Sequence, residues 1–254
     1  MRRPPREIQI FSLSALDLFA SAMGTFIVIA VMLFPYYLKT TKTKVRIPGI
    51  DVVYVIDTTA SMGEGVNQVR SSLAGVVAVL EKMAPSVRVG FVAYKARDGR
   101  GNDYVMIFRD LASTKQGGLL AMRRWVIRLN PQGGGTEIML EAVRKAESMK
   151  WRSGAMNVIV VVADEPGSAS ELSALVALAR RFGGPRRKIS AFLPPAGALR
   201  GMSPQQLQLL RRQRVIVRRW MKQITTAGNG IFVPPDEGDL ASATLLTVLE
   251  QVRP

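Results

Sequence analysis

The sequence predicts an α/β protein with one doubly wound, mostly parallel sheet that is flanked by helices and preceded by one transmembrane helix. Three observations favour this fold class. Short apolar runs rich in β-branched residues alternate with helical stretches along residues 47–254, which is typical of parallel sheets with helices on both faces. Two of these runs end in an aspartate, and ligands of such sheets bind at the carboxyl ends of the strands. An uncharged segment near the N-terminus has the length of a membrane span.

The transmembrane helix comes first along the chain. Residues 18–38 carry no charge and would span roughly 31 Å as a helix, enough to cross a bilayer core. A cleavable signal peptide is the competing interpretation, but its apolar region is shorter and ends at a small-residue cleavage site. This segment instead ends in an aromatic and basic sequence at 35–39, which is typical of a membrane interface. We therefore expect a basic arm at 1–8, an uncleaved transmembrane helix at 9–38 and a polar linker at 39–46.

Asp17 is the only charged residue in the wider apolar segment 8–38. An ionisable group within a membrane helix costs roughly 2.5–3.5 kcal/mol on insertion scales and indicates a functional site. In an alternative interpretation Asp17 stabilises the start of the helix, because Ser14 and Asp17 have the spacing of a capping box. Basic residues lie on both sides of the span, so the distribution of positive charge does not decide its orientation.

The rest of the chain, residues 47–254, is predicted to form one domain with one substantial core. Strands are expected at short apolar runs bounded by turn residues, and helices where apolar positions recur with helical spacing. The expected strands are 51–57, 87–95, 103–109, 157–163, 188–193 and 230–233. The expected helices are 63–83, 117–129, 138–149, 169–182, 203–226 and 238–252.

Asp57, Thr59 and Ser61 follow the apolar run 52–56 at alternate positions. Side chains at alternate positions of an extended segment point to the same side. One carboxylate and two hydroxyls therefore converge where the strand ends. Oxygen ligands of this kind suit a hard divalent cation such as Mg²⁺. In the alternative interpretation the hydroxyls only cap the following helix, and Asp57 is a buried, hydrogen-bonded residue.

The same residues resemble the metal-ion-dependent adhesion site of von Willebrand factor A domains, whose first loop reads D-x-S-x-S. Here Thr59 stands at the middle position and keeps the hydroxyl. Thr136 follows three glycines, as the metal-binding Thr of the family does, and Asp164 follows the apolar run 158–163, where the family places its second Asp. The resemblance extends over residues 45–254 and implies a binding module in which a carboxylate of a partner protein completes the coordination of the metal. It implies a Mg²⁺ (or Mn²⁺) ion held by Asp57, Thr59, Ser61, Thr136 and Asp164, the last two directly or through water.

A second resemblance concerns residues 14–19 and the apolar helix that follows. They are similar to the membrane helix of TolR, ExbD and MotB proteins, the smaller subunits of ion-driven stator complexes. That family often has a Pro shortly before the aspartate, where this chain has Ser14. The resemblance implies that Asp17 carries a proton or sodium ion, and that a homodimer of such helices lies inside a pentamer of a TolQ-, ExbB- or MotA-like subunit. It also implies a bacterial inner (cytoplasmic) membrane protein with a cytoplasmic N-terminus and a periplasmic A domain.

The composition excludes several classes of enzyme. The chain has no Cys and no His, so the usual zinc sites, thiol nucleophiles and Ser-His-Asp triads are ruled out. A metal-dependent hydrolase that uses Asp57 and Asp164 is disfavoured, because no second metal-ligand cluster or general base stands out. The net charge of +16 is compatible with nucleic acid, anionic lipid or an acidic envelope polymer. Nucleic acid is not the expected partner, because no aromatic residues interleave with the basic ones to stack on bases.

We therefore expect a membrane-anchored, non-enzymatic subunit of an ion-driven motor complex. Its A domain would bind an extracytoplasmic protein or an envelope polymer through the metal site. The alternative is a single-pass membrane-tethered adhesion or scaffold protein without ion coupling.

Overall fold

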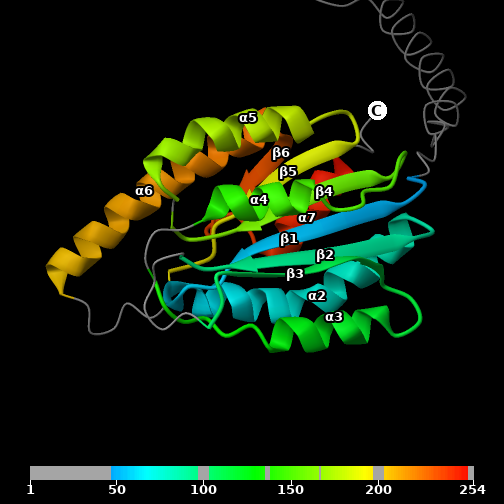
Figure 1. Ribbon diagram of the computed structural model, residues 1–254, viewed down its shortest axis with the longest axis horizontal. Helices are drawn as coiled ribbons and strands as arrows, with labels where there is room; N and C mark the ends of the chain where they lie inside the picture. Colours follow the sequence, from blue (N-terminus) through cyan, green and yellow to red (C-terminus); the bar gives the residue numbers. More distant parts are fainter. Residues whose placement is uncertain (1–46, 97–102, 135–137, 166, 197–202, 251–254) are drawn as a thin grey trace, which may run out of the picture. The chain divides into compact units, whose positions relative to one another are not determined.

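A computed structural model describes residues 47–96, 103–134, 138–165, 167–196 and 203–250. These residues form a six-stranded sheet with the strand order β3-β2-β1-β4-β5-β6 (Figure 1). β3 is antiparallel to β2, and all other neighbouring strands are parallel. The predicted mostly parallel sheet is therefore confirmed. The strands are β1 (Ile50–Asp57), β2 (Val87–Tyr94), β3 (Met106–Ser113), β4 (Met156–Val162), β5 (Arg187–Phe192) and β6 (Asn229–Val233).

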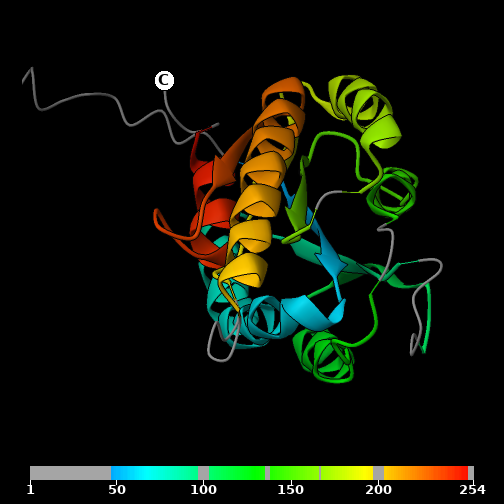
Figure 2. The same ribbon diagram turned by 90° about the vertical axis from the view of Figure 1, so that its left-hand side faces the viewer.

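Helices cover both faces of the sheet, as the sequence predicts (Figure 1, Figure 2). One face is covered by α2, α3 and α7, and the other by α4, α5 and α6. The buried side chains of each group of helices form a separate apolar core with one face of the sheet. The helices are α2 (Gly63–Met83), α3 (Gly118–Ile127), α4 (Met139–Glu147), α5 (Leu172–Phe182), α6 (Pro204–Ala227) and α7 (Leu240–Leu249). Short 3-10 turns, η1 (Ala60–Met62) and η2 (Ala169–Glu171), precede α2 and α5.

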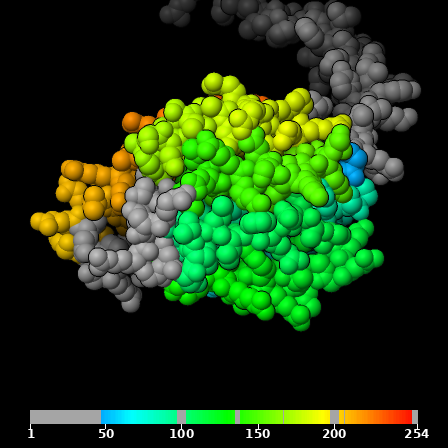
Figure 3. Space-filling view, viewed as in Figure 1, coloured from blue at the N-terminus to red at the C-terminus, as the bar shows by residue number. Residues whose placement is uncertain are grey.

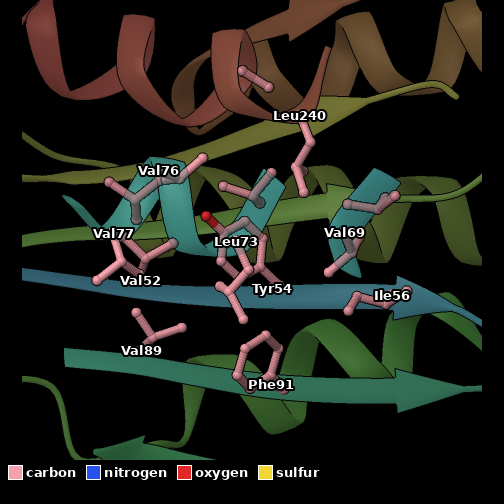
Figure 4. Close-up of a cluster of buried hydrophobic side chains, with 14 of the residues drawn as sticks. Val52, Tyr54, Ile56, Val69, Leu73, Val76, Val77, Val89, Phe91 and Leu240 are labelled. Atoms are coloured by element: carbon pink, nitrogen blue, oxygen red, sulfur yellow. The ribbon is translucent and has the colours of Figure 1, made fainter. Parts of the chain in front are cut away.

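β1 supplies side chains to both cores. All of its residues are buried, because β1 lies between β2 and β4 and has helices above and below it. Val52, Tyr54 and Ile56 point into the core under α2 (Figure 4), whereas Val53 and Val55 point into the core under α4 and α5. A parallel strand that is covered on both faces requires such a continuous apolar run.

The third strand differs from its predicted position. We expected it at 103–109, whereas β3 spans Met106–Ser113. The residues before it are held in the preceding loop by their side chains: Asp103 pairs with Lys95, and the hydroxyl of Tyr104 bonds to Thr58. The prediction was wrong by about half a strand, because these long-range pairs leave no local pattern. The other predicted strands and helices are present, with ends displaced by at most three residues.

The predicted basic arm at 1–8, transmembrane helix at 9–38 and linker at 39–46 lie outside the described residues, and Asp17 lies there too. Within the described ranges, no helix combines the length and the hydropathy needed for a membrane span. The transmembrane helix and its domain boundaries therefore stay predictions.

Candidate metal centre

The candidate site lies where the strand order of the sheet reverses. β1 pairs with β2 on one side and with β4 on the other. Asp57 is the last residue of β1, and Asp164 follows β4 by two positions. Because β1 and β4 are parallel neighbours, their carboxyl ends meet at one edge of the sheet, where open α/β sheets bind their ligands.

The loop after β1 folds back onto Asp57. The Oδ1 atom of Asp57 accepts hydrogen bonds from the backbone N–H and from the hydroxyl of Thr59, both at 2.8 Å. The Thr59 hydroxyl lies 3.3 Å from the Ser61 hydroxyl, which donates a hydrogen bond to Asp164 Oδ1 at 3.0 Å. Four of the five predicted ligands therefore form a continuous chain of oxygen atoms across two loops.

The second carboxylate oxygen of Asp57 is unpaired. Asp57 is fully buried, and its Oδ2 atom has no hydrogen-bond partner among the described residues. Leaving a buried acceptor unsatisfied costs about 1–3 kcal/mol, and more for a charged group. Native proteins contain few such atoms. An electropositive ligand would satisfy this oxygen.

Both aspartates of the site resist ionisation. Burial raises the pKa of Asp57 well above its ordinary value, and the charge of Asp164 adds to this, while the hydrogen bonds from Thr59 oppose it. Burial also raises the pKa of Asp164, against the opposing effects of the Ser61 hydroxyl and the positive charge of Arg214. Two neighbouring carboxyl groups with raised pKa values create a site that favours a cation over a second negative charge.

Thr136, the fifth predicted ligand, lies outside the described residues. The residues that lead to it run beside the first loop. The N–H of Ala60 donates to the Gly133 carbonyl at 3.1 Å, and the N–H of Gln132 donates to the Thr58 carbonyl at 3.1 Å. The glycine-rich loop therefore begins at the site, and the role of Thr136 stays a prediction.

Sequence reasoning missed the polar residues that support the first loop. The Thr58 hydroxyl donates to the Tyr94 carbonyl at 2.8 Å and lies 2.8 Å from the hydroxyl of Tyr104. Lys95 follows β2, is fully buried and pairs with Asp103. Its ammonium group lies 4.4 Å from the centre of the Tyr104 ring. No signal in the sequence identifies these residues, because each partner comes from a different strand or loop.

The profile of the von Willebrand factor type A (VWA) domain family matches residues 51–191, which is more than half of the chain. The matched region contains both aspartates of the site. The chain belongs to the von Willebrand factor type A domain family. A comparison of the VWA chain with curated proteins found no similar sequence.

Several solved structures share the VWA fold at 14% sequence identity. The pilus adhesin SpaC from Lactobacillus rhamnosus GG, in its open conformation, has a TM-score of 0.54 over 80% of this chain and 29% of the adhesin. The protein BatB from Bacteroides thetaiotaomicron has a TM-score of 0.50 over 80% of this chain and 97% of its own. The VWA domain of SpRpn10 has a TM-score of 0.50 over 77% of this chain and 93% of its own. This chain thus spans less than a third of the adhesin, and the similarity shows the fold alone.

The residues of this VWA site fit a divalent cation. Asp57, Thr59, Ser61 and Asp164 supply only oxygen atoms, which suits Mg²⁺ or Mn²⁺. In the part of the chain that the structure describes, no group of three or more acidic side chains is placed to hold a metal ion. The candidate centre therefore depends on hydroxyl oxygens as well as carboxylates.

Proposed function

We propose that the VWA domain binds a partner carboxylate through a Mg²⁺ or Mn²⁺ ion held by Asp57, Thr59, Ser61, Thr136 and Asp164. The observation that carries the proposal is the buried, unpaired Oδ2 atom of Asp57 at one end of a chain of oxygen atoms. A cation satisfies this atom and offsets the repulsion between two buried carboxylates. Because the site contains only two carboxylates, the ion keeps positions for water or for a ligand. The domain is then a binding module for an extracytoplasmic protein or envelope polymer, and not an enzyme.

Titration calorimetry with MgCl₂ and MnCl₂ on the full chain in detergent tests the metal site. Asp57→Asn keeps the size of the side chain and removes its charge. It is expected to weaken metal binding by about a hundredfold or more, since even residues that only support a metal ligand are worth 10–100-fold. Asp236→Asn is the matched control, because that side chain is 64% exposed and pairs with Arg218 on the surface. Equal metal affinity in the wild type and in Asp57→Asn would refute the proposed metal site.

We further propose that the VWA domain is the extracytoplasmic part of an inner-membrane motor subunit. The predicted helix at 9–38 would insert as a homodimer in a pentameric TolQ-, ExbB- or MotA-like partner, with the N-terminus in the cytoplasm. Asp17 would take up and release the coupling proton or sodium ion, and the resulting motion would reach the envelope ligand through the VWA domain. The isolation of Asp17 in an otherwise uncharged segment supports this role.

Two experiments separate the motor subunit from a plain tether. Purification of the full chain from its native membrane is expected to recover a three- or four-helix TolQ-like protein. Asp17→Asn is expected to preserve insertion and assembly and to abolish ion flux in proteoliposomes that contain both subunits. Ser14→Ala is the control for the helix-capping interpretation, and it is expected to leave the flux intact. Full flux in Asp17→Asn would refute ion coupling through Asp17 and would support a tethered adhesion or scaffold protein without ion coupling.

A further inference from the structure

The edge of the sheet opposite the metal centre collects basic side chains. β1, β4, β5 and β6 are parallel, so their amino ends all lie at this edge. The described part of the domain also begins here, because Ile47 lies only three positions before Ile50, the first residue of β1. Two hollows open at this edge, each next to the start of a strand.

The first hollow lies between the turn before β4 and the turn before β5. It has a volume of about 540 Å³, and its lining includes Arg152, Arg186 and Arg187 but no acidic residue. Arg186 donates a hydrogen bond to the Gly154 carbonyl at 2.9 Å, and the Arg187 guanidinium lies 4.2 Å from the centre of the Phe182 ring. Figure 3 shows α5 and the turn after it, yellow-green to yellow, adjoining the green surface of α4 and its following turn.

The second hollow lies between α5 and α6, at the start of β6. It has a volume of about 680 Å³. Arg180 and Lys222 are its charged residues, and its lining contains no carboxylate. Both side chains belong to exposed residues, so their charges face the solvent.

Of the five basic residues named in the lining of these hollows, only Arg152 is paired with a described acid. Asp51 pairs with Arg88 and Arg152, and Glu147 pairs with Arg181. In contrast, Arg180, Arg186, Arg187 and Lys222 form no ion pair with any described residue. We call these four residues the basic edge. Four uncompensated cations on one edge of a domain form a site for anions.

We propose that the basic edge lies against an anionic lipid bilayer and binds lipid phosphate groups in its two hollows. This inference rests on the proposed membrane anchor. The eight residues of the predicted linker at 39–46 reach at most about 29 Å when fully extended, which keeps the amino ends of the strands near the membrane. Arginine forks match phosphate oxygens in geometry and charge. The metal centre, at the opposite edge, then faces away from the bilayer toward its ligand.

Fluorescence energy transfer to an acceptor lipid tests this orientation on the reconstituted full chain. The chain has no cysteine, so one dye is attached at Ser153→Cys, which lines the first hollow, or at Ser170→Cys in η2. Both serines are exposed, and they lie at opposite ends of the parallel strands. We expect more transfer from position 153 than from position 170 in phosphatidylcholine bilayers that contain phosphatidylglycerol. The excess is expected to fall in pure phosphatidylcholine and at high salt.

Charge reversal identifies the residues responsible. Arg180→Glu with Arg186→Glu is expected to lower the equilibrium constant of docking, obtained from the transfer efficiencies, by roughly fivefold for each cation removed. The control pair, Arg123→Glu with Arg124→Glu, makes the same change on two exposed arginines of α3 and is expected to leave docking unchanged. Equal transfer from both labels in anionic bilayers, or equal loss in the control pair, would overturn the inference.

Two further measurements distinguish lipid docking by the basic edge from the membrane-anchor proposal and from nucleic-acid binding. Resistance to alkaline extraction reports on the anchor alone. A chain that alkali releases, but that still docks on anionic vesicles through the position 153 side, would refute the anchor and support the basic edge. Displacement of the docked edge by duplex DNA, at an equal concentration of phosphate, would assign the edge to nucleic acid and overturn the lipid proposal.

Discussion

At the scale of single residues, Asp57 places stability and metal binding in opposition. Burial, together with the charge of Asp164, raises the pKa of Asp57 well above its ordinary value. A folded-state pKa above the unfolded one means that the protonated form stabilises the fold. That contribution is complete below the unfolded pKa of about 3.9 and is lost as the pH rises through the folded pKa. At neutral pH, which is above the unfolded pKa, folding without metal must either bury this carboxylate or protonate it, and both cost free energy that a bound cation offsets.

Asp57→Asn is accordingly expected to raise the melting temperature in the presence of a chelator at neutral pH, because the amide is neutral. Saturating Mg²⁺, at a hundred times its Kd, is expected to stabilise the wild type by about 2.7 kcal/mol, or by about 5–10 °C, and the variant hardly at all. Thermal melts with chelator and with Mg²⁺ measure both effects. Asp236→Asn should behave like the wild type, and an equal Mg²⁺ effect in Asp57→Asn would contradict the prediction.

Asp51 is also a buried carboxylate, but its pKa is lowered whereas that of Asp57 is raised. Its Oδ2 atom accepts a hydrogen bond from Arg88 at 2.5 Å, and its Oδ1 atom accepts one from Arg152 at 2.6 Å. Burial alone would raise the pKa of Asp51, but the hydrogen bonds from Arg88 and Arg152 outweigh it and hold the pKa below its ordinary value. A lowered folded-state pKa stabilises the fold above the unfolded pKa, and this stability is lost as the pH falls through the folded pKa.

Asp51→Asn is therefore expected to destabilise the domain by about 3 kcal/mol at neutral pH, because it leaves two guanidinium groups without their acid. The loss should shrink as the pH is lowered from neutral toward about 2, because the wild-type carboxylate loses its own charge as the pH falls through its folded-state pKa. Urea unfolding at both pH values measures it. Metal affinity should be unchanged, since Asp51 lies near the amino end of β1. A loss of equal size at both pH values would show that the charge of Asp51 is not the cause.

At the scale of elements, the position of α3 depends on a close approach to β3 at Gly118. A Cβ atom at this residue would collide with the carbonyl oxygen of Ser113, the last residue of β3. The N–H of Leu119 donates to the Thr114 carbonyl at 3.1 Å, which fixes the helix start against the strand end. α3 in turn buries Met122 and Val126 in the core under α2, so a displaced helix start opens that core.

Gly118→Ala is expected to destabilise the domain by about 1–3 kcal/mol, the usual cost of forcing an extra methyl group into a packed site. Gly63→Ala, at the start of α2, is the matched control because its Cβ would meet no atom within 4 Å. This control is expected to be neutral or to stabilise by up to about 1 kcal/mol. Urea unfolding at equilibrium measures both variants, and equal free energies of unfolding for the two would refute the steric argument.

At the scale of the whole molecule, the VWA domain closes its own apolar surfaces. The central strands β1, β2, β4 and β5 are covered on both faces by helices, and the apolar runs of the described residues are short enough to be core strands. We therefore expect residues 45–254 to be soluble and folded without the N-terminal segment. Urea unfolding of this fragment, followed by circular dichroism, should show one cooperative transition without detergent. A fragment that stays in micelles or unfolds without a transition would contradict this.

The two proposed binding surfaces of the domain lie at opposite ends of the parallel strands. The metal centre lies at the carboxyl ends of the strands and the basic edge at their amino ends. If both proposals hold, variants of one edge are expected to leave binding at the other edge unaffected.

The sequence by itself determined the type and order of the described elements and singled out Asp57, Thr59, Ser61 and Asp164, which the structure brings together. Hydrophobic periodicity and turn residues act over a few neighbouring positions, so they can be read along the chain. The alternation at Asp57, Thr59 and Ser61 is local in the same way. Asp164 was predictable because it follows a second apolar strand, although only the strand order shows that β4 lies next to β1. Asp17 and Thr136 lie outside the described residues and stay predictions.

Only the tertiary structure decided where β3 begins, which residues support the first loop and where the uncompensated charges gather. Thr58 and Tyr104 are 46 positions apart, and Ser61 and Asp164 are 103 apart. Contacts of this kind depend on strand order and burial, and no local pattern carries them. The unpaired Oδ2 atom of Asp57 is likewise a property of the packed site, because a side chain loses its water partners only when the whole fold closes around it.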